Sequence, residues 1–288
     1  MIAILADIHA NLYALEAVLE DMPRVSQIWL LGDALGCLNY PGEVLDRLLN
    51  LDAPVYSILG NHEEALLDEK NGKHPDWRMG TQYASMIWTS EALKPRHWEY
   101  IEGLRPAQSV DSVPGGALLY HGLPGSTRGC IFTEDAARKA AQGRPERILA
   151  GGHSHQARMF RLGSQAVMDA GSVGIALGGI GGTACYALLD EEKADPARYA
   201  VFRSVAYDVE GAVASLMKSE LPERAPGITR AAASELRTGR HYMMALVIFA
   251  MNCAEKQLGY RPGIIPPEIW RQAEIEWDGA EWTPGRSQ

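Results

Sequence analysis

The sequence is poor in cysteine and has no long apolar run. Its cysteines are widely spread over the 288 residues, without a Cys-x-x-Cys pair, at positions Cys37, Cys130, Cys185 and Cys253. This spacing argues against a disulfide framework and is typical of free thiols in a reducing compartment. The apolar run at 2–6 is too short for a signal peptide, and the one at 242–254 has the length of a buried helix. We therefore expect a cytoplasmic protein without a membrane partner.

The sequence also lacks an excess of positive charge. The formal net charge is −9 and the pI about 5.4. The surface as a whole therefore repels polyanions, and long nucleic acid is not an expected partner. Low-complexity segments and runs of like charge are absent too, and a composition of 47% hydrophobic and 22% charged residues is typical of a globular protein. Composition alone selects no function.

Apolar runs and amphipathic stretches alternate over the first sixty residues. Apolar runs at 2–6, 28–31 and 55–59 are separated by helical patterns at 12–22 and 41–51. This order is β-α-β-α-β with crossovers of helical length, which predicts parallel strands in an α/β sheet.

A second group of strands is predicted further along the chain. Two helical patterns lie within 80–103, and the strands ALLY (117–120) and RILAG (147–151) flank another helix. Short alternating segments with glycine-rich turns over 157–208 predict an antiparallel meander. A second sheet packed on the first would give a two-sheet sandwich with helices outside.

The pattern becomes helical and rich in Trp near the C-terminus. We predict a main domain over residues 1–221 and a helical appendage over 222–288, packed on the core or on a partner subunit. Its stretch at 241–258 is apolar over most of its circumference, which predicts a buried helix. Both the core and a second copy of the chain could cover this helix, so a homo-oligomer formed through the C-terminal helices stays open.

Five predicted strands end in polar clusters that offer metal ligands. These clusters occupy the carboxyl ends of the strands, the edge at which open α/β sheets bind ligands. Side chains two apart on an extended segment point the same way, which would pair Asp7 with His9 and His153 with His155. In chain order the clusters contain Asp7 and His9, Asp33, Asn61 and His62, His121, and His153 and His155.

A single polar residue after a strand is usually a helix cap, a turn former or a satisfied polar group. That interpretation fails for the whole set, because five of the eight histidines lie in these clusters. The other three, His74, His97 and His241, lie on predicted loops or helices and are assigned to surface or packing roles.

The ligand types indicate the kind of metal site. Imidazoles and carboxylates without a thiolate favour Mn, Fe, Zn, Co or Ni, and the ligands exceed what one four-coordinate ion needs. We therefore predict two divalent ions, about 3.5–4 Å apart, with Asp33 as the natural bridge. Two such ions bring four positive charges and Asp7 and Asp33 remove two, which leaves a charge that matches a phosphate oxyanion. The neutral amide of Asn61 preserves that charge.

The ordered motifs Asp7-x-His9, Gly32-Asp33, Gly60-Asn61-His62-Glu63, His121-Gly122 and Gly151-Gly-His153-x-His155 resemble those of the calcineurin-like metallophosphoesterase superfamily. The resemblance covers about residues 1–210. Within the superfamily, the segments DIHANLYALEAVL, LGDALG and AGSVGIALGG are similar to the small bacterial and archaeal phosphodiesterase and phosphatase branch.

This resemblance implies an αββα sandwich and two divalent metal ions, with Mn or Fe favoured. His62, which lies beside a metal ligand, would be the catalytic residue, as proton donor to the leaving alkoxide or as stabiliser of the transition state. By matching position, one metal would be held by Asp7, His9, Asp33 and His155, and the other by Asp33, Asn61, His121 and His153.

Two positions depart from the protein Ser/Thr phosphatases of this superfamily. Where those proteins have an Asp that orients the catalytic His and an Arg that grips phosphate, this chain has Gly36 and Cys37. The departure argues against a protein phosphatase and leaves the orientation of His62 to another group. Arg128 is a candidate phosphate clamp in place of the missing Arg, with a solvated loop arginine as the alternative. Asn11 is a candidate substrate contact, although a helix N-cap is favoured.

Two acidic residues follow His62. Glu63 and Glu64 are candidates for bonding a metal-bound His, or they begin a helix, where acids favour the dipole. We favour the helix start for Glu64.

Together these features predict a binuclear metal-dependent phosphoester hydrolase, a phosphodiesterase or phosphatase acting on small phosphoesters or nucleotides. A metal-bridging hydroxide would attack phosphorus in line, and His62 would protonate the departing oxygen. The first alternative is a catalytically silent scaffold or regulatory protein of the same fold, which the complete ligand set disfavours. The second is a dinuclear hydrolase of another ester or amide. Substrate choice depends on loops around 64–80 and 122–133.

Overall fold

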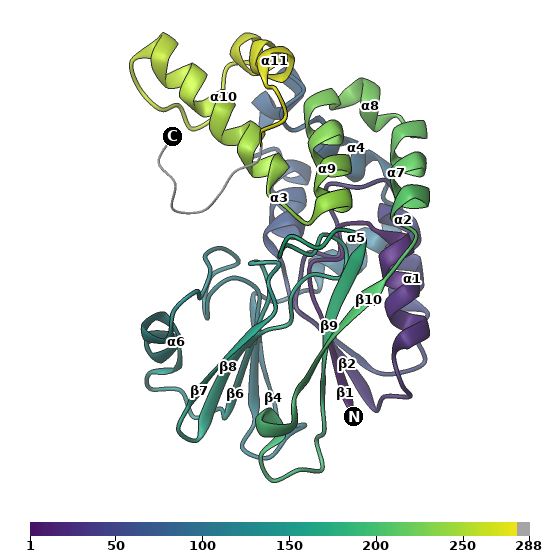
Figure 1. Cartoon of the computed structure of the whole chain (residues 1–288), viewed down its shortest axis with the longest axis vertical. Helices are drawn as coiled ribbons and strands as arrows, with labels where there is room; N and C mark the ends of the chain where they lie inside the picture. The colour runs from purple at the N-terminus through teal and green to yellow at the C-terminus, as the bar shows by residue number, and fades with distance from the viewer. Residues whose placement is uncertain (281–288) are drawn as a thin grey trace.

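Two five-stranded mixed sheets face each other in the computed structural model of the protein, which describes residues 1–280 (Figure 1). The first sheet has the order β10-β9-β1-β2-β3 and the second the order β4-β5-β6-β8-β7. The strands of the first sheet are β1 (Ile2–Leu5), β2 (Gln27–Leu30), β3 (Val55–Ser57), β9 (Thr183–Leu189) and β10 (Val201–Ala206). Those of the second are β4 (Ala107–Val110), β5 (Ala117–Tyr120), β6 (Ile148–Gly151), β7 (Arg158–Leu162) and β8 (Gln165–Asp169).

Helices cover the outer faces and one end of this sandwich (Figure 1). The helices of the first two thirds of the chain are α1 (Leu12–Asp21), α2 (Pro41–Leu49), α3 (Asn61–Lys70), α4 (Ala84–Ala92), α5 (Pro95–Glu102) and α6 (Glu134–Ala141), with short 3-10 turns η1 (Pro75–Met79) and η2 (Pro196–Tyr199). The last third contains α7 (Val209–Lys218), α8 (Leu221–Arg224), α9 (Pro226–Thr238), α10 (Tyr242–Leu258) and α11 (Pro267–Glu276).

The parallel strands of the first sheet confirm the β-α-β-α-β prediction. β1 pairs in parallel with β2, and β2 with β3. Along β1, Ile2 and Ile4 face the core between the sheets, whereas Ala3 and Leu5 face the helices outside. This alternation is the two-residue period of a strand. All four are buried because the first sheet is covered on both faces.

The predicted antiparallel meander over 157–208 is wrong as a single unit. β7 and β8 form an antiparallel pair, but β8 also pairs in parallel with β6 in the second sheet. The chain then crosses to the first sheet, where β9 pairs antiparallel with β1 and β10 with β9. Alternating hydrophobicity identifies strands with one buried face, but it does not say which sheet they join. Edge strand β4 is not predicted at all, because three of its four residues are partly or fully exposed.

The C-terminal helices pack on the sandwich and on one another. Ala232 and Leu236 of α9 join a buried cluster with Ala10, Leu38 and Ile175 from the loops at the strand ends. α10 packs on α9 and α11, and Met243 near its start also packs against the cluster that contains Ala10 and Ile175. Its buried stripe is narrow and consists of Ala245, Leu246, Ala250 and Ala254. A partner subunit and the domain boundary at residue 221 stay predictions.

The cysteines and the longest helices can be compared with the sequence predictions within residues 1–280. All four cysteines are free thiols, as their spacing predicts. Over the same range no helix combines the length and the apolar character that crossing a bilayer requires.

Candidate metal centre

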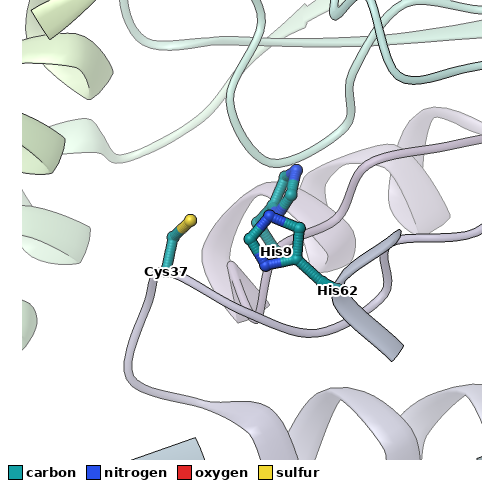
Figure 2. A group of neighbouring side chains, drawn as sticks. All are labelled: His9, Cys37 and His62. Atoms are coloured by element: carbon teal, nitrogen blue, oxygen red, sulfur yellow. The ribbon is translucent and has the colours of Figure 1, made fainter. Parts of the chain in front are cut away.

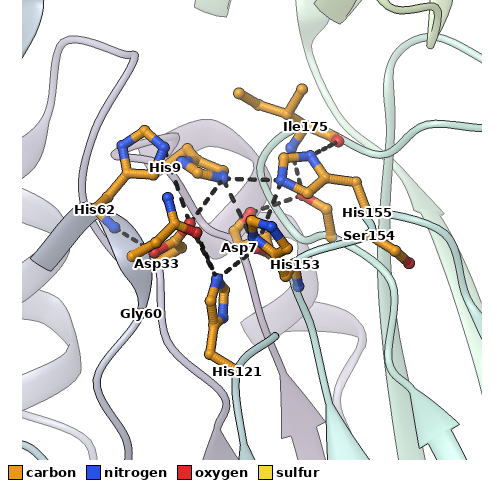
Figure 3. A network of polar contacts seen from close by, with 12 residues as sticks. Asp7, His9, Asp33, Gly60, His62, His121, His153, Ser154, His155 and Ile175 are labelled. Atoms are coloured by element: carbon orange, nitrogen blue, oxygen red, sulfur yellow. Dashed lines mark hydrogen bonds and ion pairs between the residues drawn. The ribbon is translucent and has the colours of Figure 1, made fainter. Parts of the chain in front are cut away.

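The five predicted clusters meet at one edge of the sandwich (Figure 3). β1, β2 and β3 run parallel in the first sheet, and β5 and β6 run parallel in the second. Their carboxyl ends therefore open on a shared edge, where loops from both sheets converge. The structure brings all seven predicted metal ligands together there, and His62 lies beside them.

Six of these ligands form two groups of three. Within each group, one ligand atom from every residue lies within 4.8 Å of the others. The groups are Asp7 with His9 and His155, and Asp33 with His121 and His153. Asn61 adds its Oδ1 to the second group, 3.1 Å from Nε2 of His121.

Asp33 lies between the two groups. Its Oδ2 is 3.2 Å from Nε2 of His121 and 3.8 Å from Nε2 of His9. The side chain is 1% exposed. A carboxylate in this position reaches ligands of both groups, as a bridge between two ions must.

The donor atoms fit divalent cations. Nε2 of His9 and Nε2 of His155 face each other at 3.1 Å, and both point toward Oδ1 of Asp7, which lies 3.5 Å from His155. That Oδ1 is buried and accepts no hydrogen bond within residues 1–280. A buried carboxylate oxygen without a partner is costly, and a cation coordinated by all three groups would satisfy it.

Backbone carbonyls orient two of the imidazoles. Nδ1 of His121 is 2.6 Å from the Leu31 oxygen, and Nδ1 of His155 is 2.8 Å from the Ile175 oxygen. A carbonyl only accepts, so each Nδ1 carries a proton, and in the neutral imidazole Nε2 is the nitrogen whose lone pair can bind a metal. Outer partners of this kind fix the tautomer of metal-binding histidines.

Burial keeps three of the four ligand histidines neutral. It lowers the pKa of His155 to about 3 and that of His153 to about 4, and it holds the pKa of His9 well below its ordinary value. Burial also disfavours the charged form of His121, but the Asp33 and Asp7 carboxylates outweigh it and raise the pKa of His121 to about 10. A neutral imidazole is the form that ligates metal. A cation would replace the His121 proton as the partner of these carboxylates.

The pKa values of the two carboxylates, Asp7 and Asp33, shift in opposite directions. Burial raises the pKa of Asp7 well above its ordinary value, and the neighbouring Asp33 charge adds to the rise. Burial opposes ionisation of Asp33 too, but His121 and His62 outweigh it and hold its pKa well below the ordinary value. Asp33 is therefore the carboxylate that stays charged most readily, which suits a bridging ligand.

Left-handed backbone conformations concentrate at this edge. Every non-glycine residue with positive φ within residues 1–280 is a ligand or lies beside one: Asp7, His9, Ala10, Asp33, Cys37, His153 and His155. Such conformations cost free energy and persist where the surroundings over-determine them, commonly at functional sites. Neither pair of residues two apart lies on an extended segment, so the rule that pairs side chains on a strand does not apply here. Asp7 and His9 share a group, whereas His153 and His155 fall in different groups, which is the division that the family resemblance implies.

His62 lies beside the candidate ligands and next to His9 (Figures 2 and 3). Its side chain is 23% exposed, and Nε2 lies 3.9 Å from Oδ2 of Asp33. The ring packs edge-on against the His9 ring, with centroids 4.7 Å apart. Nδ1 is buried without a hydrogen-bond partner within residues 1–280. Burial lowers the pKa of His62, although Asp33 opposes the shift.

Cys37 lies close to His9 and His62 (Figure 2). Burial raises the pKa of its thiol, and the charges of Glu235 and Asp33 add to the rise. A protonated, buried thiol is a poor nucleophile and a poor metal ligand. We therefore assign no chemistry to Cys37.

The two predicted substrate contacts occupy different environments. Asn11 is 2% exposed: its Oδ1 accepts from the Ala14 amide as the N-cap of α1, and its Nδ2 donates to the Gly174 oxygen and the Tyr207 hydroxyl. The capping role is confirmed, and these bonds engage both of its amide hydrogens within the protein. Arg128 is 63% exposed and lies 3.8 Å from the Glu64 carboxylate. Its charge contributes to the low pKa of His153, so it stays a candidate phosphate clamp.

The three histidines assigned to other roles lie away from the ligand groups. His74 stacks on Trp77, with ring centroids 4.2 Å apart. His97 is fully buried and lies 2.6 Å from the Asp46 carboxylate. His241 is partly buried at the start of α10, and burial lowers its pKa.

Comparison with known proteins agrees with this architecture. A two-sheet sandwich with imidazole and carboxylate ligands at the strand ends is the arrangement of a metallophosphoesterase. The family model for the calcineurin-like phosphoesterase superfamily domain matches residues 1–194. The chain therefore belongs to the calcineurin-like phosphoesterase superfamily.

Individual relatives come from bacteria and archaea. The crystal structure of a metallophosphoesterase from Sphaerobacter thermophilus is 27% identical with a TM-score of 0.66, and the match covers 83% of this chain and 98% of that one. Hypothetical protein PH1004 from Pyrococcus horikoshii OT3 shares the fold at 21% identity, with a TM-score of 0.68 and coverage of 83% and 99%. Uncharacterized protein MJ0912 of Methanocaldococcus jannaschii is 28% identical over 122 residues, 42% of this chain and 48% of that protein. The chain thus matches about half the length of this curated relative.

Proposed function

We propose that the protein is a binuclear metal-dependent phosphoester hydrolase that acts on small phosphoesters. The observation that carries the proposal is the pair of ligand groups, Asp7-His9-His155 and Asp33-His121-His153, with Asp33 placed between them. Asn61 completes the second group. Family membership and the metallophosphoesterase from Sphaerobacter thermophilus support the reaction class. The cytoplasm stays the predicted location.

The residues at this edge would hold two divalent ions, with Mn or Fe favoured. When bound, such ions polarise phosphoryl oxygens and lower the pKa of a coordinated water toward about 7. The protein supplies neutral imidazoles for this purpose, because burial lowers the pKa values of His9, His153 and His155. Asp7 and Asp33 provide two negative charges against the four positive charges of the ions. The remaining positive charge would draw a phosphate group into an otherwise acidic protein.

His62 is the proposed general acid. It is the only histidine of this edge outside both four-residue ligand sets, and it is partly open to solvent. Its Nε2 lies 3.9 Å from Oδ2 of Asp33, the proposed bridging carboxylate. A leaving oxygen close to the ions would therefore lie near the His62 ring. Its neutral form would stabilise phosphoryl oxygens by donating a hydrogen bond, and its protonated form would give a proton to the departing alkoxide.

The first experiment is a substrate panel with matched metal analysis. Purified protein is stripped of metal, reloaded separately with Mn²⁺, Fe²⁺, Zn²⁺, Co²⁺ and Ni²⁺, and assayed with p-nitrophenyl phosphate, bis-p-nitrophenyl phosphate and a set of nucleotides. We expect about two ions per chain by elemental analysis and turnover that depends on them. Protein that holds two ions but is inert toward the whole panel would contradict the proposal.

The second experiment separates His62 from the metal ligands. His62→Ala is expected to lower kcat by about 10²–10⁴-fold, the usual contribution of a general acid, while the metal content stays at two ions. His74→Ala is the matched control, because His74 stacks on Trp77 away from the ligand groups. Full activity in His62→Ala would exclude it as the general acid.

A further inference from the structure

A carboxylate from α3 holds the loop that carries Asp33. Glu63 is 1% exposed, and both of its oxygens accept backbone hydrogen bonds. Oε2 accepts from the amides of Asp33 at 2.9 Å and Gly60 at 3.1 Å, and Oε1 accepts from the amide of Leu35 at 2.9 Å. One side chain thus joins loop 32–37 to the start of the helix that carries Asn61 and His62.

The loop also accepts a hydrogen bond from the helix, and the two pack closely. Oδ1 of Asp33 accepts from the His62 amide at 2.9 Å. A Cβ at Gly60 would lie 2.2 Å from the Asp33 nitrogen, and a Cβ at Gly36 would lie 2.1 Å from Nδ1 of His62. The loop and the helix are therefore in close contact at both glycines, with no room for a side chain. Because Asp33 and Gly36 belong to the same short loop, a shift of that loop would move Asp33 and also Gly36, against which the His62 ring packs.

Loop 32–37 needs an external restraint. Four of its six residues have positive φ: 85° at Gly32, 51° at Asp33, 105° at Gly36 and 44° at Cys37. Asp33 and Cys37 are not glycines, and side chains at such φ values are tolerated only where surrounding contacts over-determine the conformation. Among these contacts, the Glu63 carboxylate bonds two of the loop amides.

His62 has no hydrogen bond on Nδ1 within residues 1–280, so no side chain orients its ring in that way. Its position rests on its backbone bond to Asp33 and on its packing against Gly36 and the His9 ring. We propose that Glu63 is a positioning residue for this site. By clamping loop 32–37 onto α3, it places Asp33 between the two ligand groups and seats Gly36 against the His62 ring. The catalytic consequence rests on the function proposed above, whereas the geometric consequence does not.

The alternative role is purely structural. Glu63 is the third residue of α3, where an acidic side chain favours the helix dipole and caps the backbone. In that case Glu63→Gln would lower stability and leave the geometry of the folded site unchanged. The two roles therefore differ in what they predict for the metals in correctly folded protein.

The test uses the full chain loaded with two Mn²⁺ ions. In Glu63→Gln the side chain keeps its size, but its NH₂ group must face a backbone N–H donor, so at least one clamp bond is lost. We expect kcat to fall about 10–100-fold, as for other groups that orient metal ligands, with KM within about threefold. We also expect the exchange-coupled di-manganese electron paramagnetic resonance spectrum to change or to give way to signals of isolated Mn²⁺. Asp68→Asn, a change at a partly exposed position of the same helix that pairs with Lys73, is the control and should match the wild type in kcat and in spectrum.

Two results would overturn the proposal: a wild-type coupled spectrum in folded Glu63→Gln, or a rise in KM with kcat unchanged. Should Glu63→Gln not fold, Glu63→Asp carries the same test, because it keeps both oxygens on a stem shortened by one methylene. Its spectrum and kcat should lie between those of the wild type and a clamp-free site, and a wild-type spectrum would again refute the clamp. If wild-type protein shows the coupled spectrum and Glu63→Gln alters it while every phosphoester is inert, the clamp stands and the proposed function fails.

Discussion

At the strand ends, histidines and carboxylates crowd into a buried space with left-handed backbone, whereas α10 and α11 meet through alanine, isoleucine and tryptophan. Within residues 1–280, Oδ1 of Asp7 at the metal edge and Nε1 of Trp270 between α10 and α11 are both buried without a hydrogen-bond partner. The cluster between α10 and α11 contains Leu246, Ala250, Ala254, Ile265, Ile269, Trp270 and Ala273. The metal edge is destabilised by neighbouring like charges and strained φ values, whereas the cluster between α10 and α11 is stabilised by the removal of apolar surface from water.

This difference separates function from stability within one chain. Polar residues at the metal edge are costly in the metal-free protein, so their replacement should affect activity far more than folding. Apolar residues between α10 and α11 belong to a separate buried cluster that contains none of the candidate ligands, so their replacement should affect folding far more than activity. The following changes test the separation, beginning with the largest expected effect.

Asp33→Asn should reduce phosphoester hydrolysis to the background rate. The amide can still accept the His62 hydrogen bond through its oxygen, but it removes the one negative charge that reaches both ligand groups. We expect fewer than two ions per chain by elemental analysis. Asp33→Asn protein that keeps both ions and wild-type kcat would show that Asp33 is not the bridge.

Trp270→Ala should leave the metal edge intact and weaken the fold. Trp270 is fully buried between α10 and α11, and truncation of a buried Trp costs about 3–5 kcal/mol in the free energy of unfolding. Urea denaturation measures this loss, and kcat per folded molecule should equal that of the wild type well below the transition. Ile275→Ala on the same helix is the control, because Ile275 is 80% exposed and should cost less than about 0.5 kcal/mol. Loss of metal from folded Trp270→Ala would mean that the two regions are coupled.

Glu235→Gln should change the pH dependence of stability. Glu235 is buried in α9 and accepts from the amides of Met243 and Tyr242, and burial raises its pKa to about 7. A raised carboxyl pKa means that the folded state holds a proton the unfolded state has lost. Its contribution therefore falls as pH rises from the unfolded value of 4.5 to about 7, and it is constant above that. We expect the wild-type free energy of unfolding, relative to Glu235→Gln, to fall by about 2 kcal/mol from pH 5 to pH 7.5. A difference independent of pH would contradict the shifted pKa.

Local pattern was sufficient for much of the fold. The runs of the first sixty residues predict β1, α1, β2, α2 and β3 because burial on both faces leaves an unbroken apolar strand between amphipathic helices. Local pattern was insufficient for residues 157–208, where β8 pairs with β6 in one sheet and β9 pairs with β1 in the other. The pairing of β8 with β6 passes over β7, and that of β9 with β1 joins residues more than 180 apart, so no short window contains either contact. The narrow buried stripe of α10 has the same origin, since it depends on where α9 and α11 lie.

The candidate site divides in the same way. The convergence of the candidate ligands could be predicted because the carboxyl ends of parallel strands share an edge, and because imidazoles and carboxylates at five such ends have no joint structural explanation; that the five ends come from two sheets is seen only in the structure. The spacing of His153 and His155 predicted one shared centre, whereas the family resemblance implied two different sets, and the structure places the two side chains in different groups. The backbone hydrogen bonds of Glu63 could not be predicted, because the start of a helix is by itself a sufficient explanation for an acidic residue at that position of the sequence.

The sequence by itself determined the superfamily, the seven candidate ligands and His62, because residue type and order carry that chemistry. Only the tertiary structure gave the distances within and between the two groups, and only it showed that Gly36 and Glu63 take part in holding His62 in place. These are distances between loops far apart in the chain, and they are set by how the two sheets pack rather than by any local pattern.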